Sequence, residues 1–328
     1  MKNKYFYKSN NFYHGIMFHN FYDNLNYSKG DGAISKKNFI DLINFIGKKN
    51  ILNGDIFIKK IINKSIKKRQ VCLTFDDSIK SQIKIALPIL QKLKIKAIFF
   101  IHTSIFENNN NNNLELFKYF RLNYYGGKRK YYNDFFKLVN KFKDINNFLS
   151  IHKYEIKKKK KLFPFYSRKD IEFRIIRDHF LSPFTYQRLN LELIKNKNFN
   201  KKKIKKNLFF NKNDIKKIIN EGHIIGLHSH NHPTFIQDLN YNDQKREYTK
   251  NLIILKKLFP KIKKINCMAH PCGSYNTETL NILNRLKIKV GFKQIMKIEN
   301  EKKMKKINNS NLEIAREDAV NIINRMKV

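Results

Sequence analysis

Residues 71–77 read Val-Cys-Leu-Thr-Phe-Asp-Asp, an apolar run of strand-forming residues that ends abruptly in two acids. The pattern predicts a buried strand that delivers Asp76 and Asp77 at its carboxyl end. In parallel α/β folds and barrels, functional side chains lie at that end of the strands. Adjacent strand-end carboxylates point in different directions, so one can ligate a metal ion while the other acts as a general base. The alternative is that one of them caps a helix starting near Ser78.

Residues 226–235 read Gly-Leu-His-Ser-His-Asn-His-Pro-Thr-Phe, which places three of the chain's ten histidines within five positions. On a helix, His228 and His232 would share one face, with Cβ atoms roughly 5–6 Å apart. Such a pair can hold one divalent ion, because neutral imidazole nitrogen suits zinc and its neighbours. His230 would lie on another face, as a wall residue or behind the ligands. A polar loop of solvated histidines is the alternative, but three histidines with a carboxylate partner elsewhere favour a metal site.

The residues after the two acids predict a parallel β-α-β unit. Residues 78–94 have the apolar spacing of an amphipathic helix, which Pro88 would bend or divide into two segments. Residues 96–102 read Lys-Ala-Ile-Phe-Phe-Ile-His and predict a second buried strand, with His102 at its carboxyl end. A strand, a helix and a parallel strand in this order form a right-handed crossover unit. The fold class we expect is therefore α/β, with a barrel as the architecture.

Further elements are expected on both sides of this unit. A first strand at 13–21 carries His19, and Ser35 is expected to cap a helix with four apolar residues at amphipathic spacing. Downstream, Asn213 is expected to cap another helix, and Arg316 is expected at a strand end. The remaining predicted strands are 224–227, 264–269 and 290–294, and the remaining predicted helices are 214–220, 241–259 and 277–286.

About 150 residues separate Asp77 from His228, far more than one helix and one strand require. Residues 108–113 are all asparagine, which predicts a disordered loop. The following stretch shows no strand alternation, and aromatic segments with helical spacing alternate with lysine runs, which are typical of solvated helix faces. We expect one domain over 1–328. Its parts are a lead-in at 1–70, a barrel core at 71–104 and 211–328, and a helical, lysine-rich insertion at 105–210 over the barrel rim.

The charge balance is extreme, with 68 Lys and Arg against 26 Asp and Glu and a formal net charge of +42. Only 11 of these cations are Arg, whereas nucleic-acid readers use Arg for its bidentate geometry. The chain is also rich in Lys, Ile, Asn, Phe and Tyr and has no Trp, a profile that an AT-rich genome would produce by codon bias. We therefore expect weak, salt-sensitive attraction to polyanions but no specific nucleic-acid partner.

Cysteine usage and hydropathy indicate the compartment. The three cysteines, Cys72, Cys267 and Cys272, are an odd number in a long chain and do not make a disulfide framework. The first residues are polar and lack the apolar core of a signal peptide. No run reaches the roughly 18 apolar residues that a transmembrane helix needs. We expect a cytoplasmic protein.

Five motifs, in this order, resemble the polysaccharide deacetylase family, that is, the NodB homology domain of carbohydrate esterase family 4. They are listed here as they stand in the chain: Ile16-Met17-Phe18-His19, Thr74-Phe75-Asp76-Asp77, His228-Ser229-x-x-His232, Pro271-Cys272-Gly273-Ser274-Tyr275-Asn276 and Ala315-Arg316-Glu317-Asp318. The resemblance reaches both ends of the chain but is loose in the middle. It implies the distorted (β/α) barrel of that family, carrying a helical insertion.

The resemblance also implies an activity: removal of the acetyl group from an N-acetylated sugar by metal-dependent amide hydrolysis. Asp77, His228 and His232 would hold one divalent ion, with zinc as the expected metal. Asp76 would be the general base, and Arg316 would pair with it and keep it ionised. The backbone N–H of Cys272 would stabilise the oxyanion.

Three positions depart from the family pattern. Ala269 stands where many members have an arginine, and Cys272 replaces an aromatic residue. The late Leu-x-x-His motif, which supplies the general acid in the family, is absent, because no histidine follows His270. The remaining histidines near the site are candidates to protonate the leaving amine or to line the substrate; they are His19, His102, His230 and His270.

Two functions remain open at this stage. The first is a cytoplasmic N-deacetylase acting on a nucleotide- or lipid-carrier-linked sugar, as a precursor of cell-surface polysaccharide or glycolipid. The second is a catalytically impaired deacetylase fold that binds carbohydrate or polyanion through its lysine-rich insertion. The complete set of acids and histidines favours the first function, and the missing late histidine favours the second.

Overall fold

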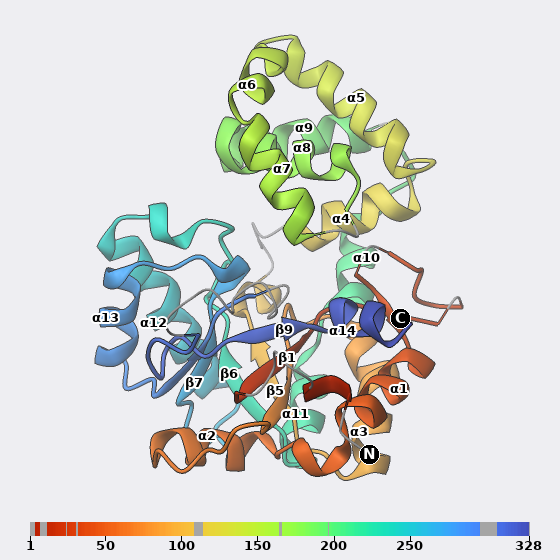
Figure 1. The fold of residues 1–328 in the computed structure, drawn as a ribbon. Helices are drawn as coiled ribbons and strands as arrows, with labels where there is room; N and C mark the ends of the chain where they lie inside the picture. The colour runs from red at the N-terminus through yellow and green to blue at the C-terminus, as the bar shows by residue number, and fades with distance from the viewer. Residues whose placement is uncertain are drawn as a thin grey trace. The chain divides into compact units, whose positions relative to one another are not determined.

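The computed structural model describes residues 4–6, 12–23, 25–30, 32–107, 114–163, 166–195, 197–295 and 307–327 (Figure 1). The chain divides into two compact units. One consists of Met1–Asn111 and Phe209–Val328, and the other of Asn112–Leu208. The predicted asparagine loop at 108–113 lies outside the described residues. Within the described residues, no helix is both long and apolar enough to span a bilayer.

The first unit is built on a sheet of seven strands in which every neighbouring pair is parallel. The strands are β1 (His14–Phe18), β4 (Val71–Phe75), β5 (Ile98–Ile101), β6 (Ile224–Leu227), β7 (Cys267–Ala269), β8 (Val290–Phe292) and β9 (Arg316–Asp318). Their order is β8-β7-β6-β5-β4-β1-β9. Parallel bridges from Phe292 to Ile314 and from Ile295 to Glu317 join the two edges, so the sheet is a nearly closed barrel. The predicted fold class is confirmed.

Alternate side chains of each strand face either the barrel interior or the surrounding helices. The interior contains Cys72, Phe100 and Phe292. Helix α2 (Gly54–Ile62) adds Phe57 to this interior core, where its ring stacks on that of Phe292 at 6.1 Å. The outer faces pack against the helices α1 (Lys36–Ile46), α3 (Leu87–Leu93), α11 (Lys212–Asn220), α12 (Tyr241–Leu258), α13 (Thr277–Arg285) and α14 (Ala319–Met326). A short parallel pair, β2 (Phe21–Tyr22) with β3 (Ile34–Ser35), stands apart from the barrel sheet.

Several local predictions are confirmed. Ser35 caps α1 by accepting a hydrogen bond from the backbone of Asn38. Strand β6 has the predicted bounds, and His102 follows the last residue of β5. The helix cap expected at Asn213 is wrong. Asn211 is the capping residue of α11, because it and Asp214 form a reciprocal capping box.

The segment after β4 also differs from its prediction. Asp77 and Ser78 both have positive φ, at 68° and 56°, so the chain makes a tight turn there instead of starting a helix. A π-helical turn, Gln82–Ala86, then precedes α3, and Pro88 lies in the first turn of α3. No helix therefore starts at Ser78 for Asp76 or Asp77 to cap. Pro88 marks a second helical segment, one of its two predicted roles.

Arg316 lies at a strand end, as the sequence suggested, because it is the first residue of β9. It pairs in register with Gly15 of β1, and its side chain is fully buried. Its guanidinium carbon lies 5.7 Å from the centre of the Phe100 ring, inside the barrel. A Cβ atom on Gly15 would come within 2.8 Å of Arg316 Cγ. The glycine therefore opens the path along which the arginine side chain extends.

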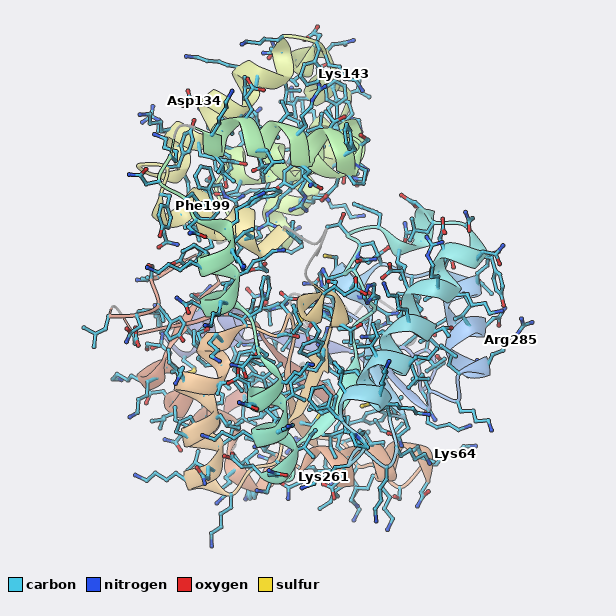
Figure 2. The ribbon with its side chains drawn as sticks, turned by 180° about the vertical axis from the view of Figure 1, so that it is seen from behind. Lys64, Asp134, Lys143, Phe199, Lys261 and Arg285 are labelled. Atoms are coloured by element: carbon cyan, nitrogen blue, oxygen red, sulfur yellow. The ribbon has the colours of Figure 1, made fainter. Side chains whose placement is uncertain are left out.

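The second unit is helical throughout its described residues, as predicted for the stretch after Glu107. Its helices are α4 (Leu114–Asn123), α5 (Lys128–Asn140), α6 (Ile145–Ile151), α7 (Lys153–Leu162), α8 (Arg168–Ile175), α9 (Pro183–Lys195) and α10 (Lys201–Leu208). Aromatic rings form a large part of its core. Arg121 is buried there, 4.9 Å from the Phe173 ring, and Phe199, labelled in Figure 2, packs edge-on against Phe120. These aromatic side chains are thus core residues of the unit.

Gly15→Ala is expected to destabilise the barrel by about 1–3 kcal/mol, because the added methyl group overpacks the Arg316 stem. Chemical denaturation followed by circular dichroism measures this free energy. Ser65→Ala, at an exposed position, is the control and should change stability by less than about 0.5 kcal/mol. Equal stabilities of the two variants would show that Arg316 needs no such path.

Candidate metal centre and active site

Polar side chains follow the carboxyl ends of five neighbouring strands. His19 lies just after β1, Asp76 and Asp77 after β4, His102 after β5, and His228 after β6; a fifth strand, β7, is followed by His270. Because all these strands are parallel, their carboxyl ends share one rim of the barrel. The rim therefore gathers residues that are up to 250 positions apart in the sequence.

Asp77, His228 and His232 form a compact, buried cluster on this rim. Asp77 Oδ1 lies 3.3 Å from His228 Nε2 and 3.1 Å from His232 Nε2, and the two Nε2 atoms are 3.1 Å apart. All three donor atoms lie within 4.8 Å of one another. Two imidazole nitrogens and one carboxylate oxygen are a donor set suited to a divalent ion. The three residues predicted as ligands therefore lie together, and their donor atoms fit a divalent metal ion.

A hydrogen bond sets the tautomer of one candidate ligand. His228 donates from Nδ1 to the carbonyl oxygen of Ala269, at 2.9 Å. With its proton on Nδ1, the ring presents the lone pair of Nε2 to the cluster. Such a bond behind a ligand also fixes the ring orientation.

The helical explanation for the histidine pair is wrong. His228 follows the last residue of β6, and the segment after it is a loop in which Ser229 and His232 have φ angles of 58° and 54°. The backbone N–H of His232 donates to Ser229 Oγ at 3.0 Å and closes this turn. A tight turn with two left-handed residues thus brings the rings of His228 and His232 together. Helical spacing, which the sequence suggested, is not the reason.

The inner face of α12 holds this loop in place. Asn251 accepts a hydrogen bond from the His228 N–H at 3.1 Å, and its amide donates to the Ile101 carbonyl at 2.9 Å. Glu247 accepts from the backbone N–H groups of His230 and Asn231. Sequence reasoning missed both α12 residues. The signal was polar residues at helical spacing on the face of α12 that apolar residues otherwise occupy.

Asp76 lies beside the cluster and faces Arg316. Its Oδ1 accepts from Arg316 Nη1 at 2.7 Å, and its Oδ2 lies 4.0 Å from His228 Nε2. Burial raises the pKa of this carboxyl, but the charges of Arg316 and nearby histidines outweigh burial and hold the pKa below its ordinary value. The arrangement therefore supplies an ionised carboxylate next to the candidate metal site.

His19 lies on the other side of Asp76, with its Nε2 3.8 Å from Asp76 Oδ2. Its side chain is 25% exposed, against 1% for His228. Gln82 donates from Nε2 to the carbonyl oxygens of His19 and Asp76, at 2.8 and 2.6 Å, and so links the ends of β1 and β4. Gln82 was not predicted from the sequence.

Asp318 ends β9 and caps α14 by accepting from the Val320 N–H. Burial raises the pKa of its carboxyl, and the nearby His19 partly offsets this effect, so that the pKa is about 6. The sequence motif contained Asp318, but no role was predicted for it. Its place beside β1 puts a second buried carboxyl near His19.

The other predicted histidines have structural partners. His102 donates from Nε2 to the Asp77 carbonyl at 3.2 Å, and burial lowers its pKa to about 3, so the ring is neutral. His230 has both ring nitrogens engaged, one with Thr103 Oγ1 at 2.8 Å and one with the Glu107 carboxylate at 3.2 Å. His230 therefore lies at the wall of the site, held by these two contacts.

His270 and Cys272 follow β7. His270 is fully buried and donates from Nε2 to the Leu312 carbonyl at 2.9 Å, with its ring stacked on Tyr275. Cys272 lies in the turn Pro271–Gly273 with φ at 51°, and its side chain is exposed. Its backbone N–H as an oxyanion donor remains a prediction.

Taken together, a parallel barrel with an Asp-His-His cluster beside an arginine-held carboxylate has the layout of a hydrolase site. The polysaccharide deacetylase family model matches residues 63–123 and 193–291, which include both acids and all three rim histidines of the His228–His232 loop. The matched residues make up just under half of the chain, which therefore resembles this family; the members of the family are hydrolases that act on the amide bonds of N-acetyl sugars. No curated protein matches the sequence.

Solved structures of similar fold agree with this assignment. The Streptococcus pyogenes deacetylase PplD in complex with acetate is 15% identical with a TM-score of 0.51, and the match covers 93% of this chain and 90% of that one. A de-N-acetylase from Aggregatibacter actinomycetemcomitans is 13% identical with a TM-score of 0.53, covering 94% and 95%. IcaB from Ammonifex degensii is 13% identical with a TM-score of 0.52, covering 94% and 91%. At these identities the likeness is one of fold.

Purified protein reconstituted with a divalent metal is expected to retain about one equivalent, as a three-donor site predicts. His232→Ala should lose it, because one of three donors is removed. Elemental analysis after gel filtration measures the ratio. His230→Ala is the matched control and should keep the metal, since both nitrogens of His230 bind other groups. Equal metal content in the two variants would contradict the assignment of ligands.

Proposed function

We propose that the protein is a metal-dependent N-deacetylase that hydrolyses the acetamido group of a sugar. The observation that carries the proposal is the pairing of two carboxylates with separate roles. Asp77 faces the two histidine donors, whereas Asp76 faces Arg316. The match to the polysaccharide deacetylase family model supports the same reaction.

Asp77, His228 and His232 would hold the ion, and the nitrogen-rich donor set favours zinc. When bound, a zinc ion would act as a Lewis acid toward the acetyl carbonyl and lower the pKa of a water molecule. The protein's own part is to keep His228 Nε2 unprotonated through the bond from Nδ1 to Ala269. The turn closed by Ser229 keeps His232 directed at the same point.

Asp76 is the proposed general base. Its carboxylate lies next to the cluster of Asp77, His228 and His232. One of its oxygens, Oδ1, accepts a hydrogen bond from Arg316 at 2.7 Å. The second oxygen is left to take a proton from the attacking water. The paired arginine keeps the carboxylate ionised, as a base must be before the proton arrives.

His19 is the proposed proton donor to the leaving amine, in place of the missing late histidine. Its Nε2 is 3.8 Å from Asp76 Oδ2, and its side chain is more open than the other rim histidines. The alternatives are less suitable, because His102 and His270 are buried with Nε2 bonded to carbonyl groups, and His230 has both nitrogens engaged. Asp318 would orient His19.

The substrate we propose is a nucleotide- or lipid-carrier-linked N-acetyl sugar, used as a precursor of cell-surface polysaccharide or glycolipid. We also propose a cytoplasmic location. Both inferences come from the low cysteine content of the given sequence, which has three cysteines in 328 residues.

Asp76→Asn is expected to lower the rate of acetate release from N-acetyl sugars by roughly 10²–10⁴-fold, the usual contribution of a general base. Metal content should be unchanged, because Asp76 is not one of the three clustered donors. Acetate release and elemental analysis of the same samples give both quantities. Asp55→Asn, an exposed acid on α2, is the control. Full activity in Asp76→Asn would exclude the proposed base.

His19→Gln is expected to lower acetate release from an N-acetyl sugar by roughly 10²-fold or more, with metal retained. Hydrolysis of 4-nitrophenyl acetate should be nearly unaffected, because nitrophenolate leaves without a proton. His152→Gln, in the helical unit, is the control. A similar loss on both substrates would mean that His19 supports the site's structure and does not donate the proton.

The second candidate function is carbohydrate binding without catalysis. The absence of any histidine after His270 favours it. In that case the metal-loaded wild-type protein would release no acetate from N-acetyl sugars but would still bind them in calorimetry. Acetate release above a metal-free control would exclude this candidate.

A further inference from the structure

The helical unit exposes several large apolar side chains. Ile151, Tyr154 and Phe184 are 72%, 80% and 75% exposed, and Phe142 is also exposed. Single exposed apolar residues are ordinary on protein surfaces, but a group of them on one face indicates an interaction site. These four side chains form such a site if the segments that carry them lie together.

Ring contacts connect the segments that carry these residues. The Phe148 ring stacks on the Phe180 ring at 4.3 Å and lies 4.1 Å from the His152 ring. Lys143 donates from Nζ to the Phe180 carbonyl and lies 4.9 Å from its ring. Phe142 adjoins Lys143, Ile151 and Tyr154 flank His152, and Phe184 lies four residues after Phe180, across the break at Leu181 that precedes α9. We call Phe142, Ile151, Tyr154 and Phe184 the apolar tip.

Lysines surround the apolar tip. Helix α7 begins at Lys153, and Lys157 and Lys158 lie three and four residues after Tyr154, on the same side of the helix. All three lysines are exposed. The one acid in this helix, Glu155, is already paired with Lys159 and His179. The surface around the tip is therefore strongly positive.

We propose that the apolar tip and its lysines dock the protein on an anionic membrane surface. Apolar side chains gain by entering the boundary between headgroups and acyl chains, and neighbouring lysines are attracted to anionic lipid headgroups while their stems lie along apolar surface. The apolar tip supplies the apolar side chains, and α7 supplies the lysines. This inference concerns the helical unit alone and does not depend on the proposed enzyme activity.

A nucleic acid is the other polyanion that a basic surface could take. Single-stranded nucleic acids bind through aromatic stacking together with arginine. The tip, in contrast, includes the isoleucine Ile151 among its most exposed side chains, and the exposed cations near it are mostly lysines, with one arginine, Arg188. An aliphatic side chain contributes nothing to base stacking but inserts readily into lipid. The composition of the face therefore favours the membrane.

Sedimentation of the full chain with vesicles tests the proposal. Wild type should bind phosphatidylcholine vesicles containing phosphatidylglycerol at least about tenfold more tightly than pure phosphatidylcholine vesicles. The triple variant Ile151→Ser, Tyr154→Ser, Phe184→Ser should lose about tenfold or more of this affinity. The control is Leu25→Ser with Ile253→Ser, which removes exposed apolar side chains of the barrel unit and should bind as wild type does. Circular dichroism verifies that each variant is folded.

A charge variant provides a second, independent measurement. Replacing Lys153, Lys157 and Lys158 with Gln should weaken binding to the anionic vesicles about as strongly, because each lysine adds to the attraction. Unchanged vesicle binding in either the apolar or the charge variant would overturn the proposal. Binding that falls in the charge variant but not in the apolar one, and that single-stranded DNA abolishes, would show a polyanion surface in place of a membrane surface.

Discussion

The buried contact between Arg316 and Asp76 is the constraint around which the barrel rim is arranged. A buried charge is costly unless it is paired and hydrogen-bonded. Arg316 meets this requirement with Asp76 at 2.7 Å and with the Lys293 carbonyl, to which its Nε donates at 3.1 Å. These contacts connect β9 with the ends of β4 and β8. If either Arg316 or Asp76 were removed, the remaining buried charge would have no partner and would carry the full cost of desolvation.

Local backbone strain is concentrated at the same rim. Asp77, Ser78, Ser229 and His232 all have positive φ, which costs free energy in residues other than glycine. Strain of this kind persists where surrounding contacts over-determine the conformation. Here the surrounding contacts come from Asn251 and Glu247 on α12 and from His102. Part of the stability of the barrel is thus used to hold the candidate ligands in place.

The sequence predicted the barrel and the members of the cluster because strand runs and polar strand ends are local patterns. It could not predict how the histidines converge, since a left-handed turn at Ser229 leaves no periodic signal. Nor could it reveal Gln82, Asn251 or Asp318, which act through contacts between elements far apart in the chain. The sequence placed Arg316 at a strand end but gave no sign that its side chain runs past Phe100 to Asp76. A long side chain can serve a rim from the opposite end of its strand when a facing residue is glycine.

The pairing of β1 with β9 has a consequence for how the protein is made. Gly15 aligns with Arg316, so one of the earliest strands to be synthesised must wait for one of the last. At 5–20 residues per second the ribosome needs roughly 15–60 s to supply the missing partner. During that interval β1 has a free edge on the β9 side, and such edges invite pairing with other chains. The nascent barrel is therefore a natural client for chaperones that shield strand edges until translation ends.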